Sequence, residues 1–85
     1  MYSAYILQSK KDLKYYIGCT SNMDKRLSAH NQGLVKSTKS RFPLFLIHIE
    51  TFKTLGEARK RENQIKSYKG GEAFKKLINL GSVPK

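Results

Sequence analysis

The side chains that could carry out chemistry in this sequence are tyrosines, arginines, a histidine and one glutamate. A strand-like run, Tyr15–Thr20, contains Gly18 and leads into a helix-like segment in which Arg26 and His30 stand one turn apart. The sequence has no glycine-rich phosphate loop, no Cys/His zinc spacing, no clustered carboxylate pair and no nucleophile elbow around a serine. Any catalysis must therefore work with tyrosine, arginine, histidine and one glutamate.

Glu62 is an unusual residue for its position in a predicted helix. Ala58, Glu62 and Ile65 recur at i, i+4 and i+7, which places the carboxylate on the face expected to meet a sheet. A carboxylate there is costly unless it is paired or binds a metal. The alternative is an i,i+4 ion pair with Lys66 on a solvated face, which is common in helices. The sequence leaves both interpretations open.

Each remaining candidate also has a purely structural explanation. Arg26 could be a surface cation whose stem covers apolar residues of its own helix. His30 could stabilise the dipole at the end of that helix. Tyr5 and Tyr16 could be ordinary strand aromatics. Cys19 is expected to be a small packed residue, because the sequence offers it no partner for metal binding or nucleophilic chemistry.

Hydrophobic periodicity predicts three strands and three helices. The strands are expected at 2–8, 14–19 and 44–52, and the helices at 22–32, 54–68 and 72–80. Both faces of the first strand carry large apolar groups, so we expect this strand to be central. A polar hairpin at 9–12 makes the second strand antiparallel to the first. The fold class is therefore α/β (α+β), with a small, three-stranded, mostly antiparallel sheet in the order β-β-α-β-α-α. Residues 1–81 form one domain and 82–85 a tail.

Capping residues predict where the first two helices begin and end. Ser21 is the expected N-cap of the first helix, with Asp24 at the third position, and Gly33 is the expected end of that helix. Thr54 and Glu57 have the spacing of a capping box at the start of the second helix.

The chain is strongly basic, with 17 Lys and Arg against 6 acids and a formal net charge of +11. This charge predicts a polyanionic partner and salt-sensitive binding. The segment 34–43 is expected to be an exposed basic loop carrying Lys36, Lys39 and Arg41. With Lys66, these residues are the candidates for nucleic-acid binding. A ribosome-associated or simply lysine-rich protein would have a similar charge.

Three features predict a cytoplasmic protein that does not enter a membrane. No apolar run approaches the roughly 18 residues that a membrane span requires. The first residues lack the basic stretch and long apolar segment of a secretory signal. Cys19 is the only cysteine, so it cannot form an internal disulfide, which suits a reducing compartment.

The order of these residues resembles the GIY-YIG nuclease family. Ser3–Tyr5 corresponds to the first signature strand, although it keeps only the tyrosine of the signature, and Tyr16–Gly18 corresponds to the second. Arg26, His30 and Glu62 follow in the family order. The pattern covers nearly the whole chain and is most similar to the small stand-alone bacterial members. These resemble the amino-terminal nuclease domain of an excision-repair endonuclease subunit.

The resemblance implies an endonuclease that depends on a divalent cation, Mg²⁺ or Mn²⁺, held by Glu62 and the scissile phosphate. It also implies that Tyr5 or Tyr16 activates water with help from His30, while Arg26 stabilises charge on the phosphate. Ionising a tyrosine with a pKa of roughly 10 at neutral pH costs about 4 kcal/mol. A nearby guanidinium and metal would lower that cost. DNA is the implied substrate, RNA is the alternative, and repair is the implied setting.

A second hypothesis is a nucleic-acid-binding module that is weakly active or does not catalyse. The net charge of +11 favours it, and so does Cys19, which stands where some family nucleases carry a lysine. A third hypothesis is a structural protein of a ribonucleoprotein. The sequence does not indicate an oligomeric state.

Overall fold

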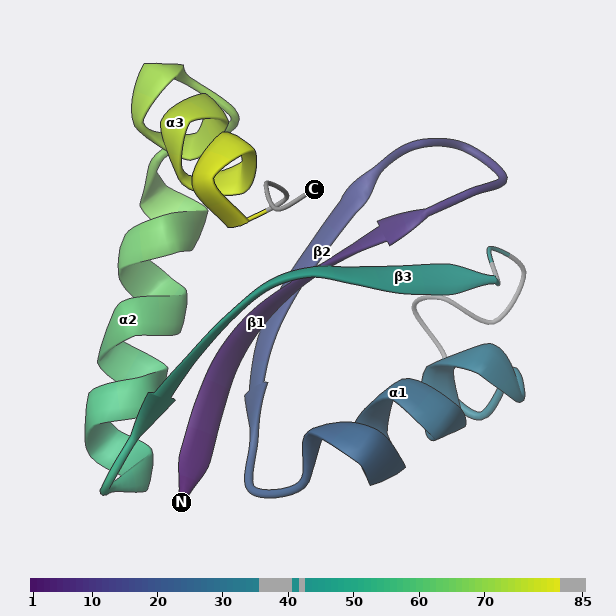
Figure 1. Cartoon of the computed structure of the whole chain (residues 1–85), viewed down its shortest axis with the longest axis horizontal. Helices are drawn as coiled ribbons and strands as arrows, with labels where there is room; N and C mark the ends of the chain where they lie inside the picture. The colour runs from purple at the N-terminus through teal and green to yellow at the C-terminus, as the bar shows by residue number, and fades with distance from the viewer. Residues whose placement is uncertain (36–40, 42, 82–85) are drawn as a thin grey trace.

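The helices and strands of the protein follow the predicted order. The computed structural model describes residues 1–35, 41 and 43–81. The elements are β1 (Tyr2–Ser9), β2 (Tyr15–Thr20), α1 (Met23–Asn31), β3 (Leu44–Phe52), α2 (Leu55–Ser67) and α3 (Glu72–Gly81) (Figure 1). The predicted fold class is therefore confirmed. The predicted tail, 82–85, lies outside the described residues.

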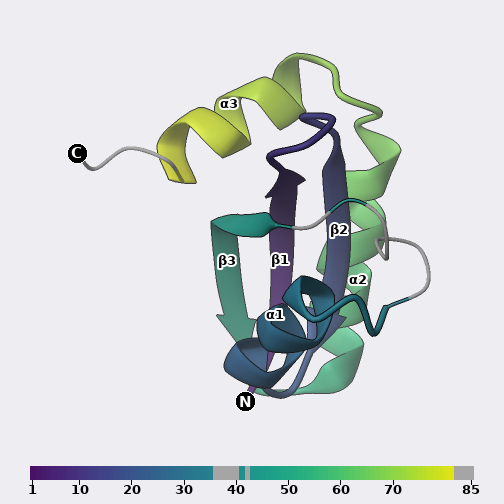
Figure 2. The ribbon, with the colours of Figure 1, turned by 90° about the vertical axis from the view of Figure 1, so that its right-hand side faces the viewer.

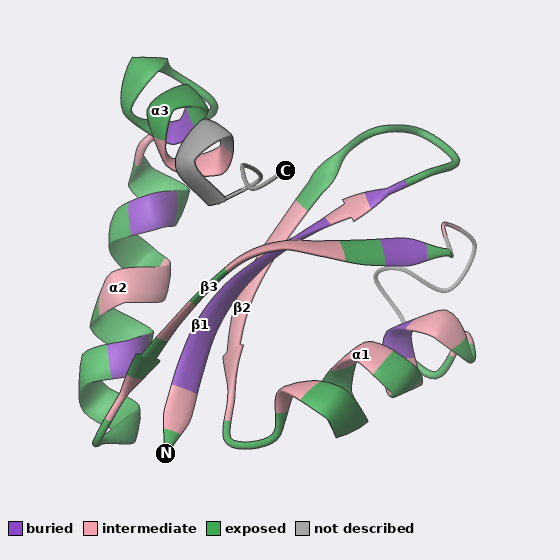
Figure 3. Cartoon of the chain, in the orientation of Figure 1, coloured by how far each residue is buried: buried purple, intermediate pink, exposed green. Residues whose placement is uncertain are grey.

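The three strands form one antiparallel sheet in the order β2-β1-β3. Helix α1 covers one face of this sheet, and α2 lies on the opposite face (Figures 1 and 2). The central strand β1 is the most buried element, as Figure 3 shows. Its central position is the one predicted from apolar side chains on both of its faces.

Side chains of β1 alternate between two hydrophobic cores, because successive strand residues point to opposite faces. Tyr5 and Leu7 belong to the core beneath α1, which also contains Leu44. Ile6 belongs to the core beneath α2 and α3. That second core contains Ile65 of α2 and Phe74 of α3.

The start of α1 differs from the prediction. Asn22, not Ser21, is the N-cap: its backbone is extended (φ −147°, ψ 98°) and its side chain accepts a hydrogen bond from the Lys25 N–H at 3.0 Å. Both residues are good caps, and the extended backbone at Asn22 decides between them. Gly33 follows the helix with φ +73°, the left-handed conformation that favours glycine there.

The predicted capping box at the start of α2 is confirmed. The Thr54 side chain accepts a hydrogen bond from the Glu57 N–H, and the Glu57 carboxylate accepts one from the Thr54 N–H, both at 3.2 Å. These bonds satisfy two backbone donors that the helix itself leaves unpaired.

Only part of the predicted basic loop is described. Lys36 and Lys39 lie outside the described residues, so their predicted role is untested. Arg41 donates from Nε to Asp12 Oδ2 at 2.7 Å and is therefore joined to the β1–β2 hairpin. Within the described ranges, no helix is long and apolar enough to cross a membrane.

Candidate active site

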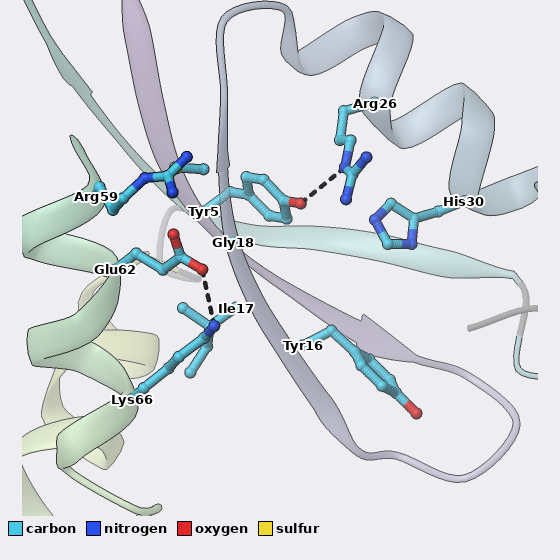
Figure 4. A pocket seen from close by; sticks show the side chains of 10 residues that line it. Tyr5, Tyr16, Ile17, Gly18, Arg26, His30, Arg59, Glu62 and Lys66 are labelled. Atoms are coloured by element: carbon cyan, nitrogen blue, oxygen red, sulfur yellow. Dashed lines mark hydrogen bonds and ion pairs between the residues drawn. The ribbon is translucent and has the colours of Figure 1, made fainter. Parts of the chain in front are cut away.

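The predicted catalytic residues gather in one cavity of about 350 Å³ along β2, an edge strand of the sheet. Side chains reach it from both faces of the sheet, from α1 on one side of β2 and from α2 on the other (Figure 4). The residues that line it are Tyr5, Tyr16, Ile17, Gly18, Cys19, Arg26, His30, Arg59, Glu62 and Lys66. All five predicted catalytic residues are among them, together with Lys66.

Tyr5 lies at the centre of this site. Its hydroxyl accepts a hydrogen bond from Arg26 Nε at 3.2 Å. Its ring also passes over Gly18: a Cβ built on this glycine would lie 2.5 Å from Tyr5 Oη and 2.7 Å from Cζ. The absence of a side chain at Gly18 therefore makes room for the Tyr5 ring.

His30 lies beside Tyr5 on the α1 side of the site. Its side chain is buried, and its ring meets the Tyr5 ring edge-on, with centroids 6.4 Å apart and an interplanar angle of 76°. Burial lowers the pKa of His30 below its usual value, and the charge of Arg26 lowers it further. The imidazole is therefore neutral at pH 7.

Glu62 reaches the site from α2, with only 15% of its side chain exposed. Lys66 Nζ lies 2.8 Å from Glu62 Oε2, so the predicted i,i+4 ion pair is present. The carboxylate does not lie on a solvated face, as the ion-pair interpretation assumed, because it turns toward β2 (Figure 4). Burial alone would raise the pKa of Glu62. Hydrogen bonds from Lys66 and Cys19 and the charges of Lys66 and Arg59 outweigh it and lower the pKa.

Cys19 is half-buried and lies next to Glu62. Burial raises the pKa of its thiol, and the neighbouring carboxylate of Glu62 raises it further. The thiol is therefore protonated at neutral pH and can donate a hydrogen bond to Glu62. This environment does not make a reactive thiolate.

Tyr16 lines the cavity, but its hydroxyl points away from Tyr5 and Glu62 (Figure 4). Burial raises the pKa of Tyr16; the charge of Arg41 opposes this effect and that of Asp12 adds to it. A raised pKa makes Tyr16 a poorer source of phenolate at neutral pH.

Arg59 is a cavity residue that the sequence analysis did not select. It extends from α2 toward β2, on the side of Tyr5 opposite to Arg26 (Figure 4). Its spacing from Glu62 and Lys66, three and seven residues, places all three on one helical face and could have identified it. Arg41, by contrast, does not line this cavity; it is paired with Asp12.

Glu62 is the residue that could hold a metal ion. In the described part of the chain, no group of three His, Cys, Asp or Glu could enclose one. A single ionised carboxylate still fits Mg²⁺ or Mn²⁺, because magnesium keeps several waters and takes one or two carboxylates plus substrate oxygens.

The chain belongs to the GIY-YIG family: the model of the GIY-YIG catalytic domain matches residues 1–75. Among its relatives are bacterial UPF0213 proteins, a name that states no activity. The one from Syntrophus aciditrophicus is 44% identical over 70 residues, which cover 80% of this chain and 79% of the relative. The one from Clostridium perfringens is 43% identical over 80 residues, which cover 93% of this chain and 84% of the relative.

A solved structure has the same fold. It is the solution NMR structure of a UPF0213 protein from Bacillus halodurans, with a TM-score of 0.62 and 30% sequence identity. The match covers 99% of this chain and 89% of that one. The predicted membership of the GIY-YIG family is therefore confirmed, and the relatives that resemble this chain are UPF0213 proteins.

Proposed function

We propose that this protein is a metal-dependent endonuclease that hydrolyses phosphodiester bonds in DNA. One observation carries the proposal: Tyr5, Arg26, His30 and Glu62, which are far apart in the sequence, line a single cavity. A proton acceptor, a guanidinium and a carboxylate around one cavity are the groups that phosphodiester hydrolysis needs. Membership of a nuclease family supports the same activity.

The cations of the cavity suit a phosphate. Arg26 and Arg59 approach from opposite sides of Tyr5, and Lys66 lies beyond Glu62 (Figure 4). A phosphate between these groups would be neutralised in its ground state, and the charge that develops during attack would be stabilised. The net charge of +11 also favours binding to a polyanion, and Lys36, Lys39 and Arg41 stay the predicted contacts of this basic segment with the nucleic acid.

Of the two candidate tyrosines, we assign the activation of water to Tyr5. Its hydroxyl receives a hydrogen bond from Arg26 inside the cavity, whereas the hydroxyl of Tyr16 points away from Glu62 and the pKa of Tyr16 is raised (Figure 4). The phenolate of Tyr5 would take a proton from the attacking water. His30 lies next to Tyr5 with its ring edge-on to the tyrosine ring, so it is the group placed to assist Tyr5.

Glu62 would hold the metal ion, which, when bound, supplies positive charge to the phosphate oxygens. Lys66 helps to keep the carboxylate ionised. Cys19 would remain a thiol that donates to Glu62 and would not take part in the reaction.

The test is nicking of supercoiled plasmid by the purified protein with Mg²⁺ or Mn²⁺. We expect open-circle product from the wild type, none with chelator, and none from Glu62→Ala. Glu72→Ala is the matched control, because Glu72 lies in the first turn of α3 and outside the cavity. A parallel reaction with structured RNA tests the alternative substrate. If no metal-dependent nicking appears on linear, branched, damaged or single-stranded DNA, the proposal fails.

The ion pair between Lys66 and Glu62 supports a second candidate function, a nucleic-acid-binding module without catalysis. In that case Lys66 would keep the carboxylate permanently occupied, and Glu62→Ala would leave salt-sensitive DNA binding unchanged while no nicking occurred.

A further inference from the structure

A second cavity, of about 480 Å³, adjoins the candidate active site. Residues of the β1–β2 hairpin, β2, α2, the α2–α3 turn and α3 line it. Ile17 and Lys66 line both cavities. A ligand held at Tyr5 and Glu62 could therefore extend directly into this second space.

The wall of the second cavity is apolar and aromatic. Tyr15 is 39% exposed, and its ring meets the ring of Phe74 edge-on, with centroids 5.0 Å apart and an interplanar angle of 72°. Leu13 is 65% exposed, so it adds a large apolar side chain to the surface of the cavity. An exposed aromatic ring supported by a second, buried ring is a stable platform for a flat ligand.

Three lysines, Lys14, Lys66 and Lys69, also line the second cavity. Lys14 and Lys69 are point charges suited to a phosphate oxygen, whereas Lys66 is paired with Glu62. An apolar wall with positive charge around it is complementary to a ligand that has a flat apolar part and an anionic part. A nucleotide has both, and base–aromatic stacking tolerates every base.

The backbone of the second cavity is strained at two points. Leu13 (φ +60°) and Lys69 (φ +49°) are the non-glycine residues with left-handed backbone in the described segments, and both line this cavity. Such strain persists only where the surrounding structure enforces it, and it is concentrated at ligand sites. The protein therefore tolerates unfavourable backbone conformations at the two residues that bring one apolar side chain, Leu13, and one cationic side chain, Lys69, to this cavity.

We propose that the second cavity is a nucleobase subsite, which receives an unpaired base of the nucleic acid whose phosphate occupies the candidate active site. This inference rests on the proposed function for the position of the phosphate. A base inside a duplex is stacked on both faces and cannot meet Tyr15. The subsite therefore predicts that an unpaired nucleotide lies next to the cleaved bond.

The test compares the binding of two fluorescein-labelled DNAs by anisotropy, in EDTA and at one low salt concentration. One is a ten-nucleotide thymidine strand, and the other is the same backbone with abasic residues. Tyr15→Leu keeps an apolar side chain against Phe74 but removes the ring face. The matched control is Phe45→Leu, since Phe45 is 50% exposed and does not line either cavity. Thermal melts confirm that each variant is folded.

We expect the wild type and Phe45→Leu to bind the thymidine strand at least about five-fold more tightly than the abasic strand. Tyr15→Leu should bind both strands with the wild-type affinity for the abasic one. If Tyr15→Leu keeps the wild-type preference, the subsite is overturned, while the nicking assay judges the proposed function separately. If the wild type binds both strands equally, the subsite is also overturned, and an apolar peptide or a lipid becomes the occupant to test.

Discussion

Two half-buried carboxylates, Glu50 and Glu62, differ in how firmly the protein holds them. Both oxygens of Glu50 accept hydrogen bonds from Arg61, at 3.0 to 3.1 Å, and Oε2 also lies 2.7 Å from His48 Nε2. The partners of Glu50 are themselves held, with side-chain exposures of 23% for Arg61 and 13% for His48. Lys66, the cation paired with Glu62, is 51% exposed.

The difference separates a structural carboxylate from one available for chemistry. The partners of Glu50 come from β3 and α2 and join these elements. Glu62 lines the cavity, and its cation is a flexible lysine that solvent can take over. A carboxylate whose partner can leave is able to accept a metal ion, whereas one held by a bidentate arginine is not.

The largest expected effect is on nicking. Glu62→Gln should lower the rate about 100-fold or more, because the amide is a poor metal ligand, whereas Glu50→Gln should keep the rate within a few-fold of wild type. Single-turnover rates on plasmid, with and without EDTA, measure both variants. Equal losses in the two variants would break the distinction between these carboxylates.

The two tyrosines of the site offer a second test. Tyr5→Phe should lower the nicking rate about 100-fold, since it removes the group that we assign to the attacking water. Tyr16→Phe should lower it less than about 10-fold. The comparison uses rates at saturating DNA, with circular dichroism to establish that both variants are folded. A larger loss for Tyr16→Phe would reverse the assignment.

Stability should change in the opposite order to activity. Glu50→Gln leaves Arg61 half-buried without its counter-charge, so it should lower the free energy of unfolding by about 1–3 kcal/mol. Glu62→Gln should lower it by less than about 1 kcal/mol, because Lys66 is exposed and becomes solvated. Urea unfolding of the three proteins measures both changes. A greater loss for Glu62→Gln would mean that Glu62 is the structural carboxylate.

The free energy of unfolding should fall in two pH ranges, by smaller amounts than in the substitutions above. The lowered pKa of His30 means that the unfolded chain binds this proton more readily than the folded chain. The stabilising contribution of neutral His30 is therefore complete above pH 6.5, the ordinary pKa of histidine in the unfolded chain. It is lost as the pH falls below that value. Burial would raise the pKa of Glu50, but Arg61 and His48 outweigh it. The contribution of Glu50 is therefore lost only below the ordinary pKa of 4.5.

Urea unfolding from pH 7 to 4 tests these windows. His30→Gln should flatten the plot of unfolding free energy against pH just below pH 6.5. Glu50→Gln should flatten only the part of this plot below pH 4.5. If the slope near pH 6 persists in His30→Gln, another group must titrate there.

The sequence predicted the fold well because its signals are local. The strand Leu44–Phe52 follows from a largely apolar run, and the capping box of α2 follows from the fixed spacing of Thr54 and Glu57. The start of α1 was wrong by one residue because Ser21 and Asn22 are both good caps, and only the backbone conformation distinguishes them.

The site was predictable in part. The family pattern identified Tyr5, Arg26, His30 and Glu62, which share one cavity. The sequence did not identify the contact between Tyr5 and Gly18 or the position of Arg59, because both depend on how β1 and α2 pack against β2. The cavity next to Tyr15 depends in the same way on the meeting of a hairpin with the α2–α3 turn.

The most direct test of the account is the position of Mn²⁺ in crystals of the protein with a phosphorothioate oligonucleotide that resists cleavage. The anomalous signal of manganese locates the ion independently of any assumed mechanism. We expect one ion within about 2.5 Å of a Glu62 carboxylate oxygen and of a phosphate oxygen next to Tyr5. An ion held by Glu50, or a phosphate at Tyr5 with no ion at Glu62, would contradict it.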